Sequence, residues 1–158
     1  MPNVPSRWML GLDPTPGFDP AAFLATLLTT GRALEQSLDR ELAERGLPPS
    51  REAHALLFIG RGRARRVPIG DLARRIVLSP SATTRMVERM EARGLVRRET
   101  GRTDRRANWV VLEDEGVHIL RKVRSAARHV VRARLLGRID VRAMTRLQRD
   151  LERANLDR

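Results

Sequence analysis

The chain has 158 residues and no cysteine, so it suits one domain of ordinary size and excludes disulfides, thiolate metal sites and cysteine-based oxidation sensing. Lysine and arginine number 31 against 19 acidic residues, giving a net charge of +12, and the excess peaks over residues 51–111, with 15 basic and 6 acidic side chains. Such a field attracts phosphates, whereas no apolar run approaches the roughly 20 residues that span a membrane, so we expect a nucleic-acid partner and no membrane.

The first 18 residues contain four prolines, and the apolar residues Trp8, Met9, Leu10 and Leu12 lie among them. We interpret residues 1–18 as an extended arm, whose apolar side chains either pack on the body or a partner subunit or remain free. The segment lacks the apolar run and small-residue cleavage site of a secretory signal, so we expect a cytoplasmic protein.

A long amphipathic helix is predicted over residues 19–48. Asp19 is a suitable N-cap, Pro20 suits the first helical position, and apolar residues then recur every three to four positions. Leu24 and Leu28 widen the apolar stripe beyond what one small neighbouring domain would cover. This segment is therefore expected to be an N-terminal dimerisation helix.

A DNA-binding region is predicted over residues 49–113. It begins with a short helix that Ser50 caps and that stops at the glycines around Arg61. The next helix is indicated by apolar residues at i, i+3, i+4 and i+7, namely Ile69, Leu72, Ala73 and Ile76. Leu78 then falls in a short turn.

A further helix begins at Ser79 and Pro80. The Ser79 hydroxyl can accept an otherwise unpaired backbone N–H, and Pro80 lacks the donor that would be left unpaired at the first helical position. Gly94 suits the left-handed residue that closes the helix. The spacing predicts an inward stripe of Thr83, Met86, Val87 and Met90. Two helices joined by a short turn form a helix-turn-helix, whose second helix enters the major groove of DNA.

A basic β-hairpin is predicted directly after this helix. Residues 95–98 and 107–112 have strand character and flank the turn-prone, charged segment 99–106. A helix-turn-helix followed by such a hairpin, or wing, is suited to duplex DNA.

Two more helices are predicted in residues 114–158. The first carries an apolar stripe over residues 117–135, and Asp140 is the N-cap of the second. Terminal helices with wide apolar stripes on both sides of a basic region imply a dimer interface. The expected fold is mainly α with a small β-hairpin wing: a winged helix-turn-helix with N- and C-terminal dimerisation helices.

Several short motifs in this order resemble a known family. They are Leu72-Ala73, Leu78-Ser79-Pro80-Ser81, Thr84-Arg85, residues 91–96, Asp104-Arg105-Arg106 and residues 112–116. The chain resembles the MarR family of bacterial winged-helix transcription regulators over roughly residues 19–155 in element order. Three positions depart from the family pattern, Pro68, Thr83 and Glu113, and none of them removes a DNA contact.

The resemblance implies a homodimer that binds a pseudopalindromic operator, most often as a repressor, and that often releases it on binding a small molecule. It also implies a ligand pocket between the dimerisation helices and the DNA-binding region. The residues do not identify the ligand.

The outward face of the second helix of the motif holds the first candidate DNA contacts. They are Ser81, Ala82, Thr84, Arg85 and Arg89. Arg85 is best placed for a guanine, and Thr84 for a thymine methyl group or a phosphate. The alternative is that these residues form an ordinary solvated helix face. It is disfavoured because this helix is the second of the helix-turn-helix, the one that enters the major groove.

The wing holds the other candidate contacts, Arg102, Asp104, Arg105 and Arg106. The family's D-x-R pattern implies that Arg106 enters the minor groove and that Asp104 holds it there, which would exploit the negative potential of a narrow groove. Arg102 is interpreted as a phosphate contact or a solvated charge. The same interpretation applies to Arg97 and Arg98. The arginines of residues 61–66 are expected at most to contact the phosphate backbone of the DNA.

No catalytic or metal-binding motif is present. His54, His118 and His129 are too scattered for a metal site, and no G-x-S-x-G, H-E-x-x-H or P-loop sequence occurs. We therefore expect no metal, no cofactor and no enzyme. Two rivals to a sequence-specific regulator are a non-specific architectural DNA- or RNA-binding protein, for which the charge would suffice, and a winged helix used for protein contacts. The small number of aromatic residues argues against an RNA-binding protein that stacks bases. The basic character of the predicted DNA-binding face argues against a winged helix used for protein contacts.

Overall fold

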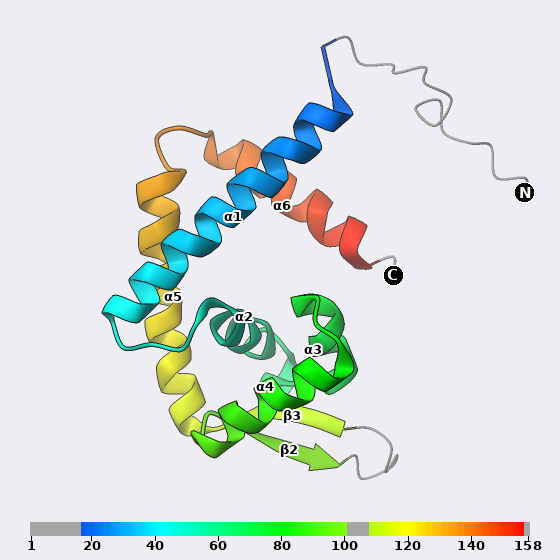
Figure 1. Cartoon of the computed structure of the whole chain (residues 1–158), viewed down its shortest axis with the longest axis vertical. Helices are drawn as coiled ribbons and strands as arrows, with labels where there is room; N and C mark the ends of the chain where they lie inside the picture. The colour runs from blue at the N-terminus through cyan, green and yellow to red at the C-terminus, as the bar shows by residue number, and fades with distance from the viewer. Residues whose placement is uncertain (1–16, 101–107, 157–158) are drawn as a thin grey trace, which may run out of the picture. The chain divides into compact units, whose positions relative to one another are not determined.

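The structure is a computed structural model that describes residues 17–100 and 108–156 (Figure 1). Its elements in chain order are α1 (Pro20–Glu44), α2 (Ser50–Ile59), the 3-10 turn η2 (Arg63–Arg65), β1 (Arg66–Pro68), α3 (Ile69–Ile76), α4 (Pro80–Ala92), β2 (Val96–Thr100), β3 (Asn108–Leu112), α5 (Asp114–Arg134) and α6 (Val141–Leu156). Within those residues no helix is both long and apolar enough to cross a membrane. The chain divides into two compact units, Met1–Ala33 and Leu34–Arg158.

The described part of the first unit is the beginning of α1. The N-cap prediction for Asp19 is confirmed, because its Oδ1 accepts hydrogen bonds from the backbone N–H groups of Ala21, at 2.9 Å, and Ala22, at 3.2 Å. The large apolar side chains here are 36–55% exposed: Phe18, Phe23, Leu24, Leu27 and Leu28. This part of α1 therefore carries an uncovered apolar stripe.

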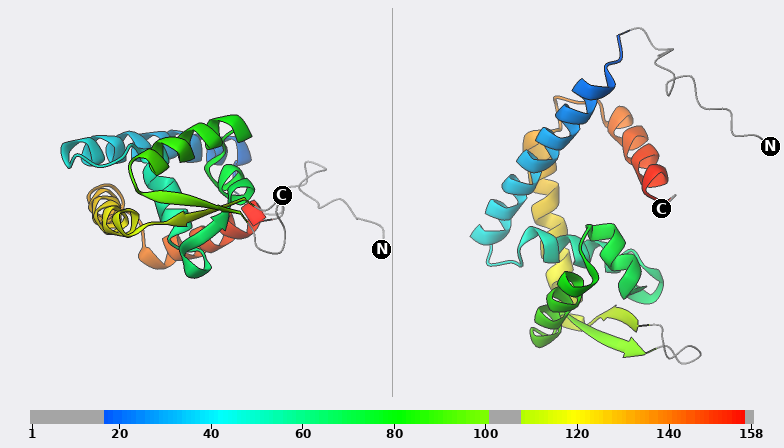
Figure 2. Two further views of the ribbon diagram at one scale, coloured as in Figure 1. Left: turned by 90° about the horizontal axis from the view of Figure 1, so that it is seen from below. Right: turned by 45° about the vertical axis from the view of Figure 1, so that its right-hand side comes forward.

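The second unit contains the hydrophobic core. In it α2 packs against α3 and α5, and α3 packs against α4 and the sheet. The fully buried side chains come from these elements and from the end of α1, and include Leu42, Leu56, Ile59, Leu72, Met86, Met90, Val110 and Val123. In both views of Figure 2, β2 and β3 run side by side away from α5.

The sheet differs from the sequence prediction by one strand. The predicted hairpin is present as β2 and β3, but β1 pairs antiparallel with the other edge of β3, so the order is β1-β3-β2. β1 is three residues long and includes Pro68, which cannot donate to a ladder and is tolerated on an edge strand. A segment so short has no recognisable alternation of apolar and polar residues, so the sequence did not predict this strand.

Three predicted helix boundaries are confirmed. The Ser79 hydroxyl accepts from the backbone N–H of Ala82 at 3.3 Å, with Pro80 as the first residue of α4. Gly94 has φ +67° just after α4. The Asp140 carboxylate accepts from the backbone N–H of Arg142 at 3.2 Å, at the start of α6.

The predicted cap at Ser50 is wrong. Pro49 is the N-cap of α2 and Ser50 is the first residue of the helix, with no side-chain cap. The backbone N–H of Ser50 instead donates to Asp39 Oδ1 of α1 at 2.8 Å. A carboxylate from the preceding helix thus takes the place of the capping hydroxyl, and it also holds the end of α1 against the start of α2.

Candidate nucleic-acid interface

The turn between α3 and α4 sets the direction of the second helix of the motif. α3 ends at Val77, whose φ of +54° is left-handed, and the backbone N–H of Leu78 donates to the Ala73 carbonyl at 3.1 Å. The inward stripe of α4 is confirmed, since Thr83, Met86, Val87 and Met90 are all buried. With one face of α4 fixed in the core, the opposite face is directed to solvent.

That outward face carries the five side chains expected on α4. Ser81, Arg85 and Arg89 are exposed, while Ala82 and Thr84 are half-buried. The Arg85 side chain forms no hydrogen bond or ion pair with any residue that the structure describes, so its guanidinium is available to a ligand. Arg89, on the same face of α4, instead forms an ion pair with a carboxylate of α2.

Arg89 and Arg93 converge on a buried carboxylate. Glu52, in the first turn of α2, is 4% exposed, and its Oε2 lies 2.9 Å from Nη1 of Arg93 and its Oε1 3.5 Å from Nε of Arg89. Sequence reasoning missed Glu52. The signal was present, because Glu52, Leu56 and Ile59 are spaced i, i+4 and i+7, which places the carboxylate on the core-facing side of α2.

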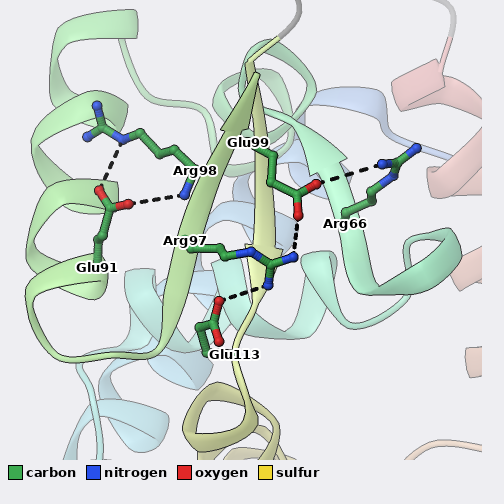
Figure 3. A network of polar contacts seen from close by, with 6 residues as sticks. All are labelled: Arg66, Glu91, Arg97, Arg98, Glu99 and Glu113. Atoms are coloured by element: carbon green, nitrogen blue, oxygen red, sulfur yellow. Dashed lines mark hydrogen bonds and ion pairs between the residues drawn. The ribbon is translucent and has the colours of Figure 1, made fainter. Parts of the chain in front are cut away.

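The base of the wing is held by a second set of ion pairs (Figure 3). Arg97 of β2 donates to Glu113 at 2.8 Å and to Glu99, and these hydrogen bonds, that to Glu113 first, raise the pKa of Arg97 above its usual range. The Glu99 carboxylate also lies 3.8 Å from a guanidinium nitrogen of Arg66. The Arg66 guanidinium in turn lies over the Trp109 ring, 4.6 Å from its centroid. Glu113 makes no cap bond to α5, so its side chain serves the wing instead.

Arg98 joins the wing to α4. Its backbone N–H donates to Glu91 at 3.1 Å, and its guanidinium lies 3.5 Å from Glu91 (Figure 3). The guanidinium also lies 3.3 Å from Glu88. The same guanidinium donates to the Thr84 carbonyl at 3.3 Å. These contacts tie β2 to the helix, and they use the charges of Arg97 and Arg98 within the protein.

The tip of the wing lies outside the described residues. Arg102, Asp104, Arg105 and Arg106 all fall there, so their roles remain predictions from the sequence. In the loop before β1, Arg61 lies 3.5 Å from Glu152 of α6.

An open cleft of about 1080 Å³ lies among α2, α3 and α4. His54, Phe58 and Arg75 line it, with the Arg75 guanidinium 5.8 Å from the Phe58 ring centroid. Loss of water around the His54 ring and the positive charges of Arg75 and Arg61 lower the His54 pKa, against a smaller opposing effect of Glu35. No cluster of three or more metal-ligating side chains occurs in residues 17–100 and 108–156.

Comparison with known proteins places this geometry in a family. A family model described as MarR family matches residues 45–107. The structure is similar to AbsC, a MarR family transcriptional regulator from Streptomyces coelicolor, with a TM-score of 0.72 and 27% identity over 89% of this chain and 95% of that one. It is also similar to the transcriptional regulator PA3341, with a TM-score of 0.70 and 31% identity over 85% of this chain and 98% of that one.

The chain belongs to the MarR family. It is accordingly a DNA-binding transcription regulator and not an enzyme, and its winged-helix fold is confirmed.

Two further similarities are narrower. A curated relative, the uncharacterized HTH-type transcriptional regulator YwhA of Bacillus subtilis (strain 168), is 38% identical over 48 residues, which is 30% of this chain and 34% of that protein. The chain thus matches about a third of the length of that curated relative. Sco3205, a MarR family regulator from Streptomyces coelicolor solved in complex with DNA, shares the fold, with a TM-score of 0.72 and 24% identity over 90% of this chain and 91% of that one.

Proposed function

We propose that the chain is a homodimeric repressor that binds a pseudopalindromic operator in the bacterial cytoplasm, where its DNA lies, and leaves it on binding a small molecule. The observation that carries the proposal is the outward face of α4, which presents Ser81, Thr84 and Arg85 while the other face is held in the core. The Arg85 side chain has no partner among the residues that the structure describes. An α-helix held in this way fits the major groove, and the DNA complex of Sco3205 gives the same fold a precedent.

Within this proposal Arg85 contacts a guanine, and Ser81, Ala82 and Thr84 contact phosphates or thymine methyl groups. Arg89 lies on the same face, with its guanidinium restrained by Glu52. Arg106, supported by Asp104, enters the minor groove, and Arg102 and Arg105 contact the backbone beside it. The ion pairs of Arg97 and Arg98 would then set the angle of the wing rather than bind DNA themselves.

The homodimer is supported by apolar surface that the single chain leaves uncovered. The beginning of α1 exposes Phe23, Leu24 and Leu28, and the segment from the end of α5 into α6 exposes Val131, Leu136, Ile139, Val141 and Leu147 by 40–57%. Large apolar side chains exposed in such numbers are unusual on a monomer. A second copy of the chain would bury them and would present two copies of α4 to one face of the duplex.

The effector proposal rests on the cleft among α2, α3 and α4. Phe58 offers an aromatic surface and Arg75 a positive charge beside it, so the cleft suits a small anionic aromatic molecule. Because the cleft is lined by both helices of the helix-turn-helix, a molecule bound there would change the relation between α4 and the rest of the core.

Sequencing the genomic DNA fragments that the purified protein retains would test the proposed function. We expect enrichment of inverted repeats whose half-sites have centres about 10 base pairs apart. Inserting about 5 base pairs between the half-sites should abolish tight binding, because one half-site is then turned to the far side of the duplex. A monomer in light scattering at micromolar concentration, or retention of all sequences alike, would favour the non-specific rival instead.

A further inference from the structure

The arginines around α4 differ in whether their guanidinium groups form an ion pair with a carboxylate. Arg85, Arg89 and Arg93 follow each other at intervals of four residues, so they lie along one side of the helix. The last two both pair with the carboxylate of Glu52, at 3.5 Å and 2.9 Å, and its single negative charge is shared between them. The Arg85 side chain has no carboxylate partner within the described part of the chain.

Glu52 is unusual among the acidic residues of this region because its side chain is only 5% exposed. An ionised carboxylate removed from water is costly unless charged partners accompany it, so the buried group holds its arginines firmly. The position at the start of α2 also favours a negative charge, through the helix dipole. The guanidinium groups remain partly exposed, with side-chain exposures of 62% for Arg89 and 46% for Arg93.

Without Glu52, the outward side of α4 would present three positive charges in a row. Contacts between such charges and phosphates carry no sequence information, and they strengthen binding to every duplex alike. A carboxylate beneath the last two arginines lowers their attraction for phosphates and leaves the base-contacting position untouched.

We propose that Glu52 is a specificity-determining residue: it pairs with Arg89 and Arg93, so that among the arginines of α4 only Arg85 keeps a guanidinium without a partner in residues 17–100 and 108–156. The inference rests on the proposed DNA-binding function and deepens it. It predicts that removing the carboxylate strengthens binding to unrelated DNA, whereas damage to the fold would weaken all binding.

The test compares Glu52→Gln with Glu44→Gln, in the full-length protein. Glu44 is exposed at the end of α1 and forms no ion pair with the described residues, so both variants lose one negative charge and retain a similar shape. Binding of a shuffled-sequence duplex and of the selected operator is measured by fluorescence anisotropy over a range of salt concentrations.

For Glu52→Gln we expect the slope of log K against log salt on the shuffled duplex to steepen by about 0.9 for each released arginine that reaches a phosphate. At about 0.1 M salt this corresponds to a gain of roughly eightfold per contact. The operator affinity should rise less, so the ratio of operator to shuffled affinity falls. Glu44→Gln should leave that ratio unchanged.

The gain should disappear when Glu52→Gln is combined with Arg89→Gln and Arg93→Gln, because no arginine is then released. Arg89→Gln alone gives an independent measurement if Glu52→Gln does not fold: with Glu52 in place it should alter the shuffled-duplex slope by less than the value of about 0.9 expected for a free arginine.

Parallel loss of operator and shuffled binding in Glu52→Gln, an unchanged slope, a gain that persists in the triple variant, or a full slope change in Arg89→Gln would each overturn the inference. Failure of the proposed function is distinguishable, since in that case the unmodified protein would itself bind operator and shuffled duplexes equally.

Discussion

Replacing Gly116 with alanine should destabilise the protein strongly. Gly116 is buried in the first turn of α5, and a Cβ built on it would lie 1.9 Å from the carbonyl oxygen of Leu95 and 2.9 Å from the carbonyl carbon. The same carbonyl oxygen accepts the backbone N–H of Glu113 at 3.1 Å. The backbone of Leu95 therefore leaves no room for a methyl group at this position.

The size of the effect follows from these contacts. A carbon atom approaches a carbonyl oxygen to about 3.3 Å, so α5 would have to move by about 1.4 Å. Overpacking of this kind costs about 1–3 kcal/mol, and disturbing the buried hydrogen bond to Leu95 adds about 1 kcal/mol. Alanine recovers about 0.5–1 kcal/mol through its better helix propensity. We expect a net loss of about 1–3.5 kcal/mol, or a Tm lower by about 2–14 °C.

Gly70 provides the matched control. It also lies in a helix, α3, but a Cβ at this position meets no atom within 4 Å. Gly70→Ala should therefore raise stability by about 0.5 kcal/mol through helix propensity alone. Thermal unfolding followed by circular dichroism, together with urea titration, would measure both variants. A Tm for Gly116→Ala within 2 °C of the unmodified protein, or a decrease of equal size for Gly70→Ala, would refute the reasoning.

Three further outcomes are expected. Arg85→Ala should relax base preference at one operator position by about 1–3 kcal/mol, whereas Arg97→Ala, whose guanidinium is already paired, should leave the selected-sequence logo unchanged; an unaltered logo for Arg85→Ala would show that it contacts no base. Arg106→Ala should weaken operator binding, most of all with A·T-rich flanks, without lowering the Tm, and equal affinities in a mobility-shift titration would refute the wing interpretation. Val77→Gly should stabilise the protein by about 1 kcal/mol, because Val77 has φ +54° and its side chain is 86% exposed; a lower Tm would contradict this.

The order of the helices, the caps at Asp19, Ser79 and Asp140, and the two faces of α4 could be predicted from the sequence. Each depends on residues close together in the chain: Ser79 bonds to Ala82, and the buried stripe of α4 follows the helical repeat. Local signals of this kind do not require knowledge of the fold, because the helix itself brings the interacting groups together.

The pairing of charges was decided only by the tertiary structure. Glu52 meets Arg93 across 41 positions of sequence, and Glu113 meets Arg97 across 16. The composition shows an excess of arginine but not which guanidinium groups are neutralised, since that depends on which helices and strands pack together. The distinction between Arg85 and Arg89, which occupy the same face of the same helix, therefore has no local signature.

Ser50 and the strand at Arg66 show the same limit for the backbone. Serine is a residue type that commonly caps helices. In this structure, however, the carboxylate of Asp39 on the preceding helix accepts the backbone N–H of Ser50. β1 has too few residues to show a strand pattern and exists because β3 offers it a free edge. Sequence by itself thus determined the elements whose hydrogen bonds are satisfied locally. Tertiary structure decided the partners of groups that pair with another element, because only packing brings such partners within hydrogen-bonding distance.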